Sequence, residues 1–171
     1  LGRARAAVAA ANDDTARQAD GEALALVELS ARQGSDADMR LLGWHHYAEK
    51  RFDAAETWFS RALGDGFEEE AMVGLLNAIR RTGDHARARD LAARHYRGSG
   101  PVTDIYIELL SMYLLETRDP KEDAAEIALL GELVAERRSA FGAETVGWKI
   151  LSKERPREAL DWFERSLGWE T

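Results

Sequence analysis

The 171-residue chain contains no cysteine, which excludes disulfides, thiolate zinc sites and a thiol nucleophile. It has no apolar run of the roughly 18 to 20 residues that a bilayer-spanning helix needs, so we expect no membrane span. Basic residues are fewer than acidic ones, 23 against 31. The resulting net charge of −8 argues against a nucleic-acid partner, because nucleic-acid-binding surfaces usually carry a basic excess.

The chain has the composition and length of a folded domain. Its hydrophobic fraction of 45% is well above that of a disordered segment, so we expect a packed core. The first residues, LGRARAAVAAAN, combine two arginines with an alanine-rich run but have no initiator methionine and no leucine-rich central segment. They do not match a secretory signal. We interpret them as helix in a fragment of a longer polypeptide.

Two stretches far apart in the sequence are nearly the same. LGWHHYAEKRFDAAETWFSRALG covers residues 42–64, and VGWKILSKERPREALDWFERSLG covers residues 146–168. The Gly-Trp pair, the central alanine and the Trp-Phe pair all recur at an offset of 104 residues. This offset corresponds to about three units of 34 to 35 residues, a length typical of helical repeats. Two divergent units are therefore expected between the copies.

The intermediate units can be recognised in the sequence. LLNAIRRTGDHARARDLAARHY aligns with the first stretch at an offset of about 33 residues, which pairs Leu75 with Leu42 and Ala88 with Ala55. DIYIELLSMYLLETRDPKEDAAEIALLGELVAE has the same rhythm with a longer turn. A fifth and weaker unit precedes them all, with GEALALVELSARQG as its second helix.

Local signals predict that every unit consists of two helices. Ala55, Phe59 and Ala62 have helical spacing, and no segment alternates apolar and polar residues as a strand would. Asp119-Pro120 and Arg155-Pro156 stand where second helices are expected to begin, since proline is tolerated in a first turn. Glycine clusters mark the turns, among them 98–101, and the acidic run 68–70 is expected to start a helix.

With these features the chain resembles the tetratricopeptide repeat family. The second unit matches that family's pattern at six positions, which are Leu42, Gly43, Phe52, Ala55, Phe59 and Ala62. The last unit matches at Val146, Gly147, Ala159 and Phe163, whereas the proline that usually ends each repeat is absent. The resemblance implies an all-α fold, a right-handed superhelix (α-solenoid) of about five antiparallel helix-turn-helix repeats. The expected repeats are 1–35, 36–68, 69–102, 103–139 and 140–171 of a single domain, 1–171.

Most of the repeated residues are expected to serve packing. Small residues such as Gly43, Ala55 and Gly147 let helices approach closely, and Phe59 and Phe163 are expected to fill the core between them. These residues predict a fold and give no direct indication of a function.

The resemblance also implies a concave groove lined by the first helix of each repeat, the surface that helical repeats most often use for binding. The candidate groove residues are Arg40, Trp44, Tyr47, Asn77, Arg80, Met112 and Trp148. Further positions on the same helix faces are Ala37, Glu70, Val73, Glu108, Phe141, Glu144 and Leu151. Two interpretations of Trp44 and Trp148 stay open: they face a partner, or they pack against the neighbouring repeat.

No residue pattern predicts catalysis or a bound cofactor. The sequence has no GxSxG motif, and GSGP at residues 98–101 lacks the Lys-Ser/Thr ending of a phosphate-binding loop. His45, His46 and Glu49 lack the HExxH order of a zinc site, so we predict no metal. We expect one of the two histidines to be packed and the other to be solvated.

These observations favour a non-catalytic scaffold that binds a protein or peptide in the groove. The Gly-Trp and Trp-Phe style of repeat is similar to periplasmic tetratricopeptide regions of bacterial cellulose exporters, which implies a part in assembling an exopolysaccharide secretion complex, a periplasmic location and contact with polysaccharide. A general peptide-binding adaptor is the first alternative, with a cytoplasmic location. A repeat region attached to a catalytic domain outside this chain is the second.

Overall fold

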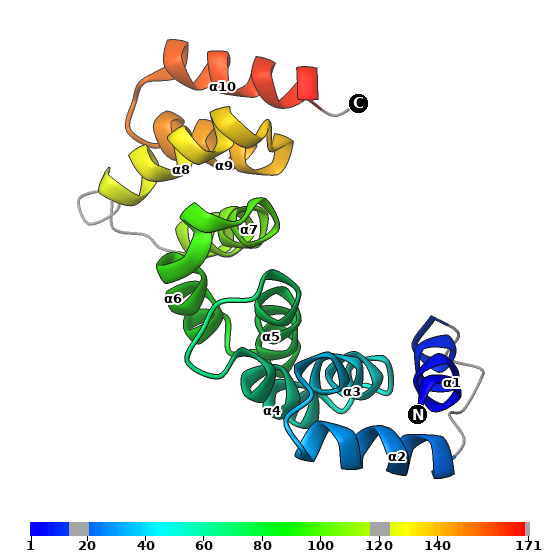
Figure 1. The fold of residues 1–171 in the computed structure, drawn as a ribbon. Helices are drawn as coiled ribbons and strands as arrows, with labels where there is room; N and C mark the ends of the chain where they lie inside the picture. The colour runs from blue at the N-terminus through cyan, green and yellow to red at the C-terminus, as the bar shows by residue number, and fades with distance from the viewer. Residues whose placement is uncertain (14–20, 117–123, 170–171) are drawn as a thin grey trace. The chain divides into compact units, whose positions relative to one another are not determined.

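The computed structural model describes residues 1–13, 21–116 and 124–169. These residues form ten α-helices and one short 3-10 helix, and no strand occurs among them (Figure 1). The α-helices are α1 (Gly2–Asp13), α2 (Gly21–Arg32), α3 (Asp36–Ala48), α4 (Phe52–Leu63), α5 (Glu69–Thr82), α6 (His85–His95), α7 (Gly100–Glu116), α8 (Ala124–Arg137), α9 (Ala140–Leu151) and α10 (Pro156–Trp169). The 3-10 helix η1 (Tyr96–Gly98) follows α6. The predicted all-α class is therefore confirmed.

The ends of the helices follow the local signals of the sequence. α5 begins within the acidic run 68–70, as predicted, and the carboxylate of Glu68 caps it by accepting hydrogen bonds from the backbone amides of Glu70 and Ala71, at 3.3 and 2.8 Å. α10 begins at Pro156, where its missing N–H removes no helical hydrogen bond. The other proline expected to begin a helix, Pro120, lies outside the described residues.

Three turns between successive helices contain a residue in the left-handed conformation at aligned positions. Lys50 has a φ of 60°, Gly83 a φ of 90° and Glu154 a φ of 59°. Gly83 lies 33 residues after Lys50, and Glu154 lies 104 residues after it. The offsets that align the sequence thus also align an uncommon backbone conformation.

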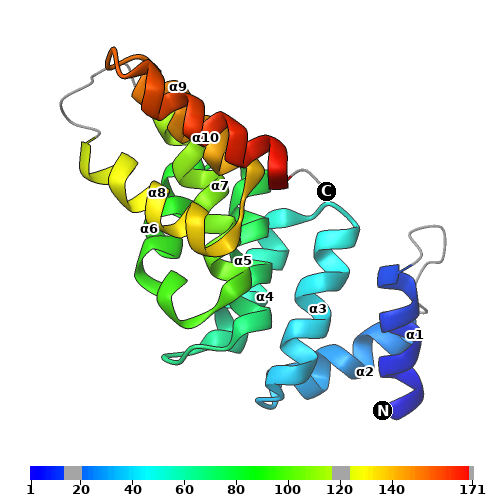
Figure 2. The same ribbon diagram turned by 90° about the horizontal axis from the view of Figure 1, so that it is seen from above.

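The chain divides into two compact units, Leu1–Ala88 and Arg89–Thr171. In the first unit α1, α2 and α3 all contact one another, and so do α3, α4 and α5. Figures 1 and 2 both show α4 beside α3 and α5. In the second unit α7, α8 and α9 repeat this mutual contact, and α10 packs on α9. The predicted repeat ranges 1–35, 36–68 and 140–171 each hold two of the described helices, whereas α7 begins at Gly100 and so crosses the predicted boundary between 102 and 103. The single domain and its repeat boundaries stay predictions.

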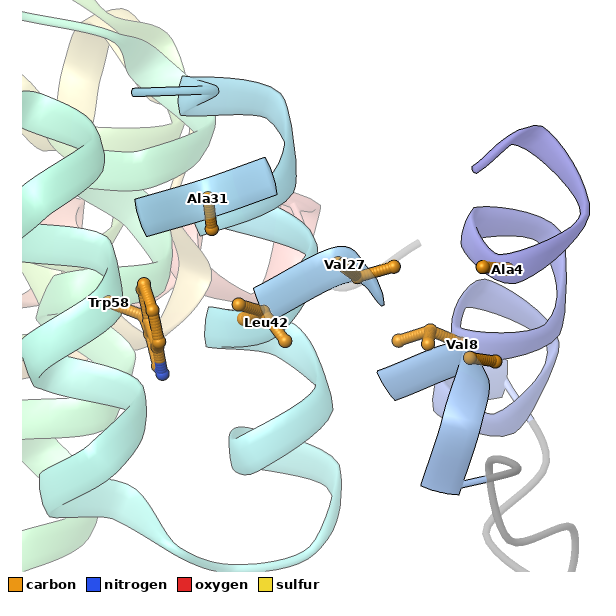
Figure 3. Close-up of a cluster of buried hydrophobic side chains, with 7 residues drawn as sticks. Ala4, Val8, Val27, Ala31, Leu42 and Trp58 are labelled. Carbon is orange, nitrogen blue, oxygen red and sulfur yellow. The ribbon is translucent and has the colours of Figure 1, made fainter. Parts of the chain in front are cut away.

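A buried apolar cluster joins the first four helices (Figure 3). Val8 of α1, Val27 of α2 and Leu42 of α3 are fully buried, and Trp58 of α4 closes the cluster with 8% of its surface exposed. Burying each of these aliphatic side chains contributes on the order of 1.5 to 3 kcal/mol. The N-terminal helix is thereby attached to the helices that carry the predicted repeat signature.

The predicted packing role of the signature residues is confirmed fully for Phe59 and only in part for Phe163. Phe59 is completely buried, and its ring lies directly against both Gly43 of α3 and Gly74 of α5. Phe163 lies against Gly147 of α9 in the same way but is only half-buried. The difference arises because α4 is covered by both α3 and α5, whereas the close backbone contact of α10 is with α9.

Among the described residues, no helix has both the length and the apolar character needed to cross a bilayer. This agrees with the absence of a membrane span expected from the sequence.

Candidate functional site

Three of the predicted groove residues lie on α3, whose start is fixed by its own sequence. The hydroxyl of Ser35 accepts a hydrogen bond from the backbone amide of Asp38 and so caps the helix. Acidic residues in the first turn stabilise the helix further, because their negative charge lies near the positive end of the helix dipole. Arg40, Trp44 and Tyr47 follow at helical spacings of four and three residues. They therefore share one side of α3.

Glu70, at the start of α5, holds two of these side chains. Its carboxylate accepts a hydrogen bond from the Nε atom of Arg40 at 3.2 Å and another from the indole Nε1 of Trp44 at 3.1 Å. Glu68 lies 3.6 Å from the same guanidinium. Arg40 is thus an ion-paired residue of the surface, and any acidic ligand would have to compete with two glutamates for it.

The ring of Trp44 packs against its own neighbourhood while keeping part of its surface exposed. It makes edge-on contacts with Phe59, at a centroid distance of 4.9 Å, and with Tyr47, at 5.7 Å. Tyr47 in turn contacts Phe52 at 5.4 Å. Trp44 therefore packs on α4 within its own predicted repeat, and it reaches the next predicted repeat through its hydrogen bond to Glu70. The other interpretation, that it faces a partner, stays a prediction.

A hollow of about 490 Å³ lies beside Arg40 and Trp44 in the first compact unit. Arg5 of α1 and Asp38 of α3 form part of its lining through a two-fold hydrogen bond, with both N···O distances at 2.6 Å. The carboxylate of Asp38 is almost fully buried, and the Arg5 guanidinium lowers the pKa of Asp38 to about 2. The sequence did not predict this pair, because its partners lie 33 residues apart and the resemblance is poor in α1.

On α5, the predicted residues Asn77 and Arg80 lie within one turn of each other. The Nη1 atom of Arg80 is 3.5 Å from the amide oxygen of Asn77, and both side chains are half-buried. Since α3 contacts α5, these residues belong to the same compact unit as Arg40 and Trp44.

The other two predicted residues lie in the second compact unit, on α7 and α9, which contact each other. Met112 of α7 is half-buried. Trp148 of α9 is 52% exposed and donates its indole N–H to Glu144 at 3.2 Å, while its ring contacts Phe163 at 5.0 Å. Trp148 is therefore the more accessible of the two groove tryptophans.

Two further apolar side chains are exposed on the same helix. Phe141 is 44% exposed and Leu151 is 38% exposed. They stand seven residues before and three residues after Trp148, spacings that place all three on one face of α9. The resemblance predicted these positions to face the groove.

The expectation of one packed and one solvated histidine is wrong, because both are buried. His45 is 3% exposed and its Nδ1 atom lies 3.2 Å from the side-chain oxygen of Asn12. His46 is 8% exposed, and its Nδ1 atom has no hydrogen-bond partner among the described residues. Burial lowers the pKa of both, that of His46 to about 4. α1, which the repeat pattern does not describe, packs on α3 and contributes Asn12, which contacts His45.

No cluster of three His, Cys, Asp or Glu side chains suited to a metal ion occurs among the described residues. Comparisons with known proteins add no assignment: no protein-family model matches the chain, and no curated protein is similar to it.

Proposed function

We propose that the chain is a non-catalytic scaffold of the tetratricopeptide type, a right-handed superhelix of about five repeats that binds a protein segment on the first helix of each repeat. The observation that carries the proposal is the exposed face of α9. Phe141, Trp148 and Leu151 expose between 38% and 52% of their surface on that face. Neighbouring exposed apolar side chains that include aromatic rings are typical of surfaces that bind other proteins.

Two further features support the repeat architecture. The mutual contact of three successive helices recurs with α3, α4 and α5 and with α7, α8 and α9. Lys50, Gly83 and Glu154 share the left-handed conformation at positions that the sequence offsets align. Both features are those of one structural unit used repeatedly along a chain.

Peptide selection tests the proposal without a known partner. A phage-displayed library of random 15-residue peptides is selected on the full chain, and the peptides recovered are measured by fluorescence anisotropy. The variant Phe141→Ser/Trp148→Ala/Leu151→Ser should weaken their binding at least tenfold, because truncating central aromatic residues of an interface removes most of its binding energy.

The matched control replaces exposed leucines elsewhere in the chain. Leu26 and Leu29 of α2 are 49% and 55% exposed, and Leu26→Ser/Leu29→Ser should leave binding unchanged. If selected peptides bind the α9 variant as well as the original protein, the α9 face is not the binding surface.

A polysaccharide ligand is the second candidate, and the exposed ring of Trp148 is the observation in its favour. Flat aromatic surfaces stack on sugar rings, and the indole of Trp148 is half exposed. This candidate rests on the similarity of the repeats to those of exopolysaccharide exporters, and it implies a periplasmic location. A titration with cello-oligosaccharides should change the fluorescence of Trp148, identified by subtracting the response of Trp148→Phe. An unchanged spectrum would reject direct contact with sugar.

A further inference from the structure

A second hollow, of about 510 Å³, lies between α8, α9 and α10 in the second compact unit. We call it the α8–α10 groove. Its floor contains Val146 and Ile150 of α9, which are 1% and 5% exposed, and Trp162 of α10 forms part of its wall. The side from α8 combines small residues such as Ala128 and Gly131 with Ile127 and with the carboxylate of Glu132. The floor is therefore apolar, and the groove is wide enough for one or two large side chains.

This groove is separate from the α9 face of the proposed function. Val146 and Trp148 are two residues apart, and two residues turn a helix by roughly 200°. Their side chains consequently point to opposite sides of α9, with Val146 buried in the groove and Trp148 exposed.

The rim of the groove carries cations that lack ionic partners. Arg155 is paired with Glu158, but within the described part of the chain no carboxylate lies in ion-pair distance of Lys153 or Arg165. The guanidinium of Arg165 lies over the ring of Trp162 at 4.8 Å. The groove is thus lined by three cations, Lys153, Arg155 and Arg165, and by two carboxylates, Glu132 and Glu158. This local excess of positive charge, in a chain with a net charge of −8, is suited to an acidic ligand.

The positions of these cations indicate the size of the ligand. Lys153 precedes α10, whereas Arg165 lies nine residues after the first residue of that helix. At about 1.5 Å per residue α10 rises roughly 14 Å from Pro156 to Arg165, so the two cations belong to opposite ends of the α10 side of the groove. A single small carboxylate cannot reach both, but an extended chain covers that distance with about four residues at about 3.3 Å each.

We propose that the α8–α10 groove binds an acidic protein segment in which two carboxylate residues about four positions apart flank apolar side chains. The carboxylates pair with Lys153 and Arg165, and the apolar side chains enter the space above Val146 and Ile150. This is an additional binding surface, and it does not depend on binding at the α9 face.

A labelled peptide tests this inference directly. Fluorescein-Gly-Glu-Leu-Ala-Leu-Glu-Gly is titrated with the full chain and followed by fluorescence anisotropy. Saturable binding is expected, weakening as salt rises because the ion pairs are screened. The basic counterpart Gly-Lys-Leu-Ala-Leu-Lys-Gly should bind at least tenfold more weakly, and so should the acidic peptide with alanine in place of both leucines.

Variants assign the binding to the groove. Lys153→Ala/Arg165→Ala should weaken binding of the acidic peptide at least tenfold, and Ala128→Phe should weaken it by filling the space, since Ala128 is exposed and its replacement need not disturb the core. Arg157→Ala, on the same helix but outside the groove, and Phe141→Ser/Trp148→Ala/Leu151→Ser should both leave it unchanged. Circular dichroism checks that each variant stays helical.

Several outcomes would overturn the inference. These are the absence of saturable binding to the original protein, equal binding of the acidic and basic peptides, and binding that Lys153→Ala/Arg165→Ala does not change. Dodecanoate is titrated in parallel, because a fatty acid also combines a carboxylate with an apolar chain. Binding of dodecanoate without binding of the acidic peptide would show a lipid site and would reject the peptide ligand.

Discussion

Gly74 of α5 lies directly against the ring of Phe59 in α4, so that a Cβ atom added at Gly74 would come within 2.4 Å of two ring carbons. Gly43 of α3 approaches the same ring, and a Cβ atom added there would come within 2.6 Å of one of these carbons. The ring is fully buried and cannot move aside without disturbing both helices. One aromatic side chain between two glycines thus sets how closely α3, α4 and α5 pack.

The first prediction concerns Gly74. Gly74→Ala should lower the free energy of unfolding by about 1 to 3 kcal/mol, because the added methyl group overpacks the Phe59 contact. Gly131→Ala is the matched control within a helix, since its Cβ would meet Trp162 at an ordinary 3.4 Å. There the gain in helix propensity should leave stability unchanged or raise it by up to about 1 kcal/mol. Urea denaturation measures both, and a Gly74→Ala variant as stable as the control would disprove the close contact.

The Phe59 contact also shows how far the sequence could predict the fold. Gly43 and Phe59 belong to one helix pair and recur together as Gly147 and Phe163, so repetition alone predicted their packing. The contact of Gly74 with Phe59 was not predicted. The 33-residue offset aligns Gly43 with Leu76, so the alignment does not identify Gly74 as the packing glycine of the next helix. Contacts between successive pairs depend on the length of the connecting turn, and repetition within the pairs does not reveal it.

For the candidate site, the resemblance to the repeat family placed Phe141, Trp148 and Leu151 on one face of their helix, where their side chains are exposed. It could not predict that Glu70 binds both Arg40 and Trp44, because those bonds depend on where α5 lies against α3. Nor could it predict that both histidines are buried. His45 is contacted by Asn12 of α1, and α1 carries no repeat signature.

The second prediction concerns the buried carboxylate of Asp38, whose folded-state pKa is lowered to about 2 by Arg5. An acid with a lowered pKa stabilises the fold above its unfolded-state pKa, and that stabilisation is lost as the pH falls from about 4 to about 2. Because Arg5 is 43% exposed and its charge is screened by solvent, we expect a contribution of about 1 to 2 kcal/mol. Asp38→Asn should therefore reduce the loss of stability between pH 5 and pH 2.5, measured by urea denaturation.

A similar pair on the surface provides the control for Asp38. Arg137 donates two hydrogen bonds to Asp104, at 2.7 and 2.8 Å, also across 33 residues. Both side chains are substantially exposed, at 37% and 51%. Asp104→Asn should change the acid dependence much less than Asp38→Asn. Equal effects of the two substitutions would show that burial of Asp38 contributes nothing.

The third prediction concerns His46, whose folded-state pKa is lowered to about 4 by burial. A histidine with a lowered pKa binds protons more weakly in the folded state, so stability is fully present above about pH 6.5 and is lost as the pH falls toward 4. The loss for this side chain is at most about 3 kcal/mol. His46→Leu should reduce the difference in unfolding free energy between pH 7.5 and pH 5. Part of that difference should persist in the variant, because the pKa of His45 is also lowered. His85→Gln, at an exposed position, is the control, and the hypothesis fails if both variants keep the original pH dependence.

The last prediction concerns Glu70, which accepts hydrogen bonds from Arg40 and from the indole of Trp44. Glu70→Ala removes both bonds, yet the unfolding free energy should fall by less than about 1 kcal/mol, because solvent screens an ion pair whose acidic partner is 54% exposed. The indole of Trp44 should nevertheless become more accessible, since it loses the acceptor that holds it against α5.

Acrylamide quenching measures this access, with the response of Trp44→Phe subtracted to isolate Trp44 from the other tryptophans. Glu70→Gln separates charge from hydrogen bonding, because its amide oxygen still accepts the indole N–H, so quenching should stay near that of the original protein. Glu69→Ala, at the neighbouring exposed position of α5, is the control and should also have no effect. Equal quenching in Glu70→Ala and the original protein would mean that packing on Phe59 and Tyr47 alone orients the ring. In that case Glu70 would act on this surface only by neutralising Arg40.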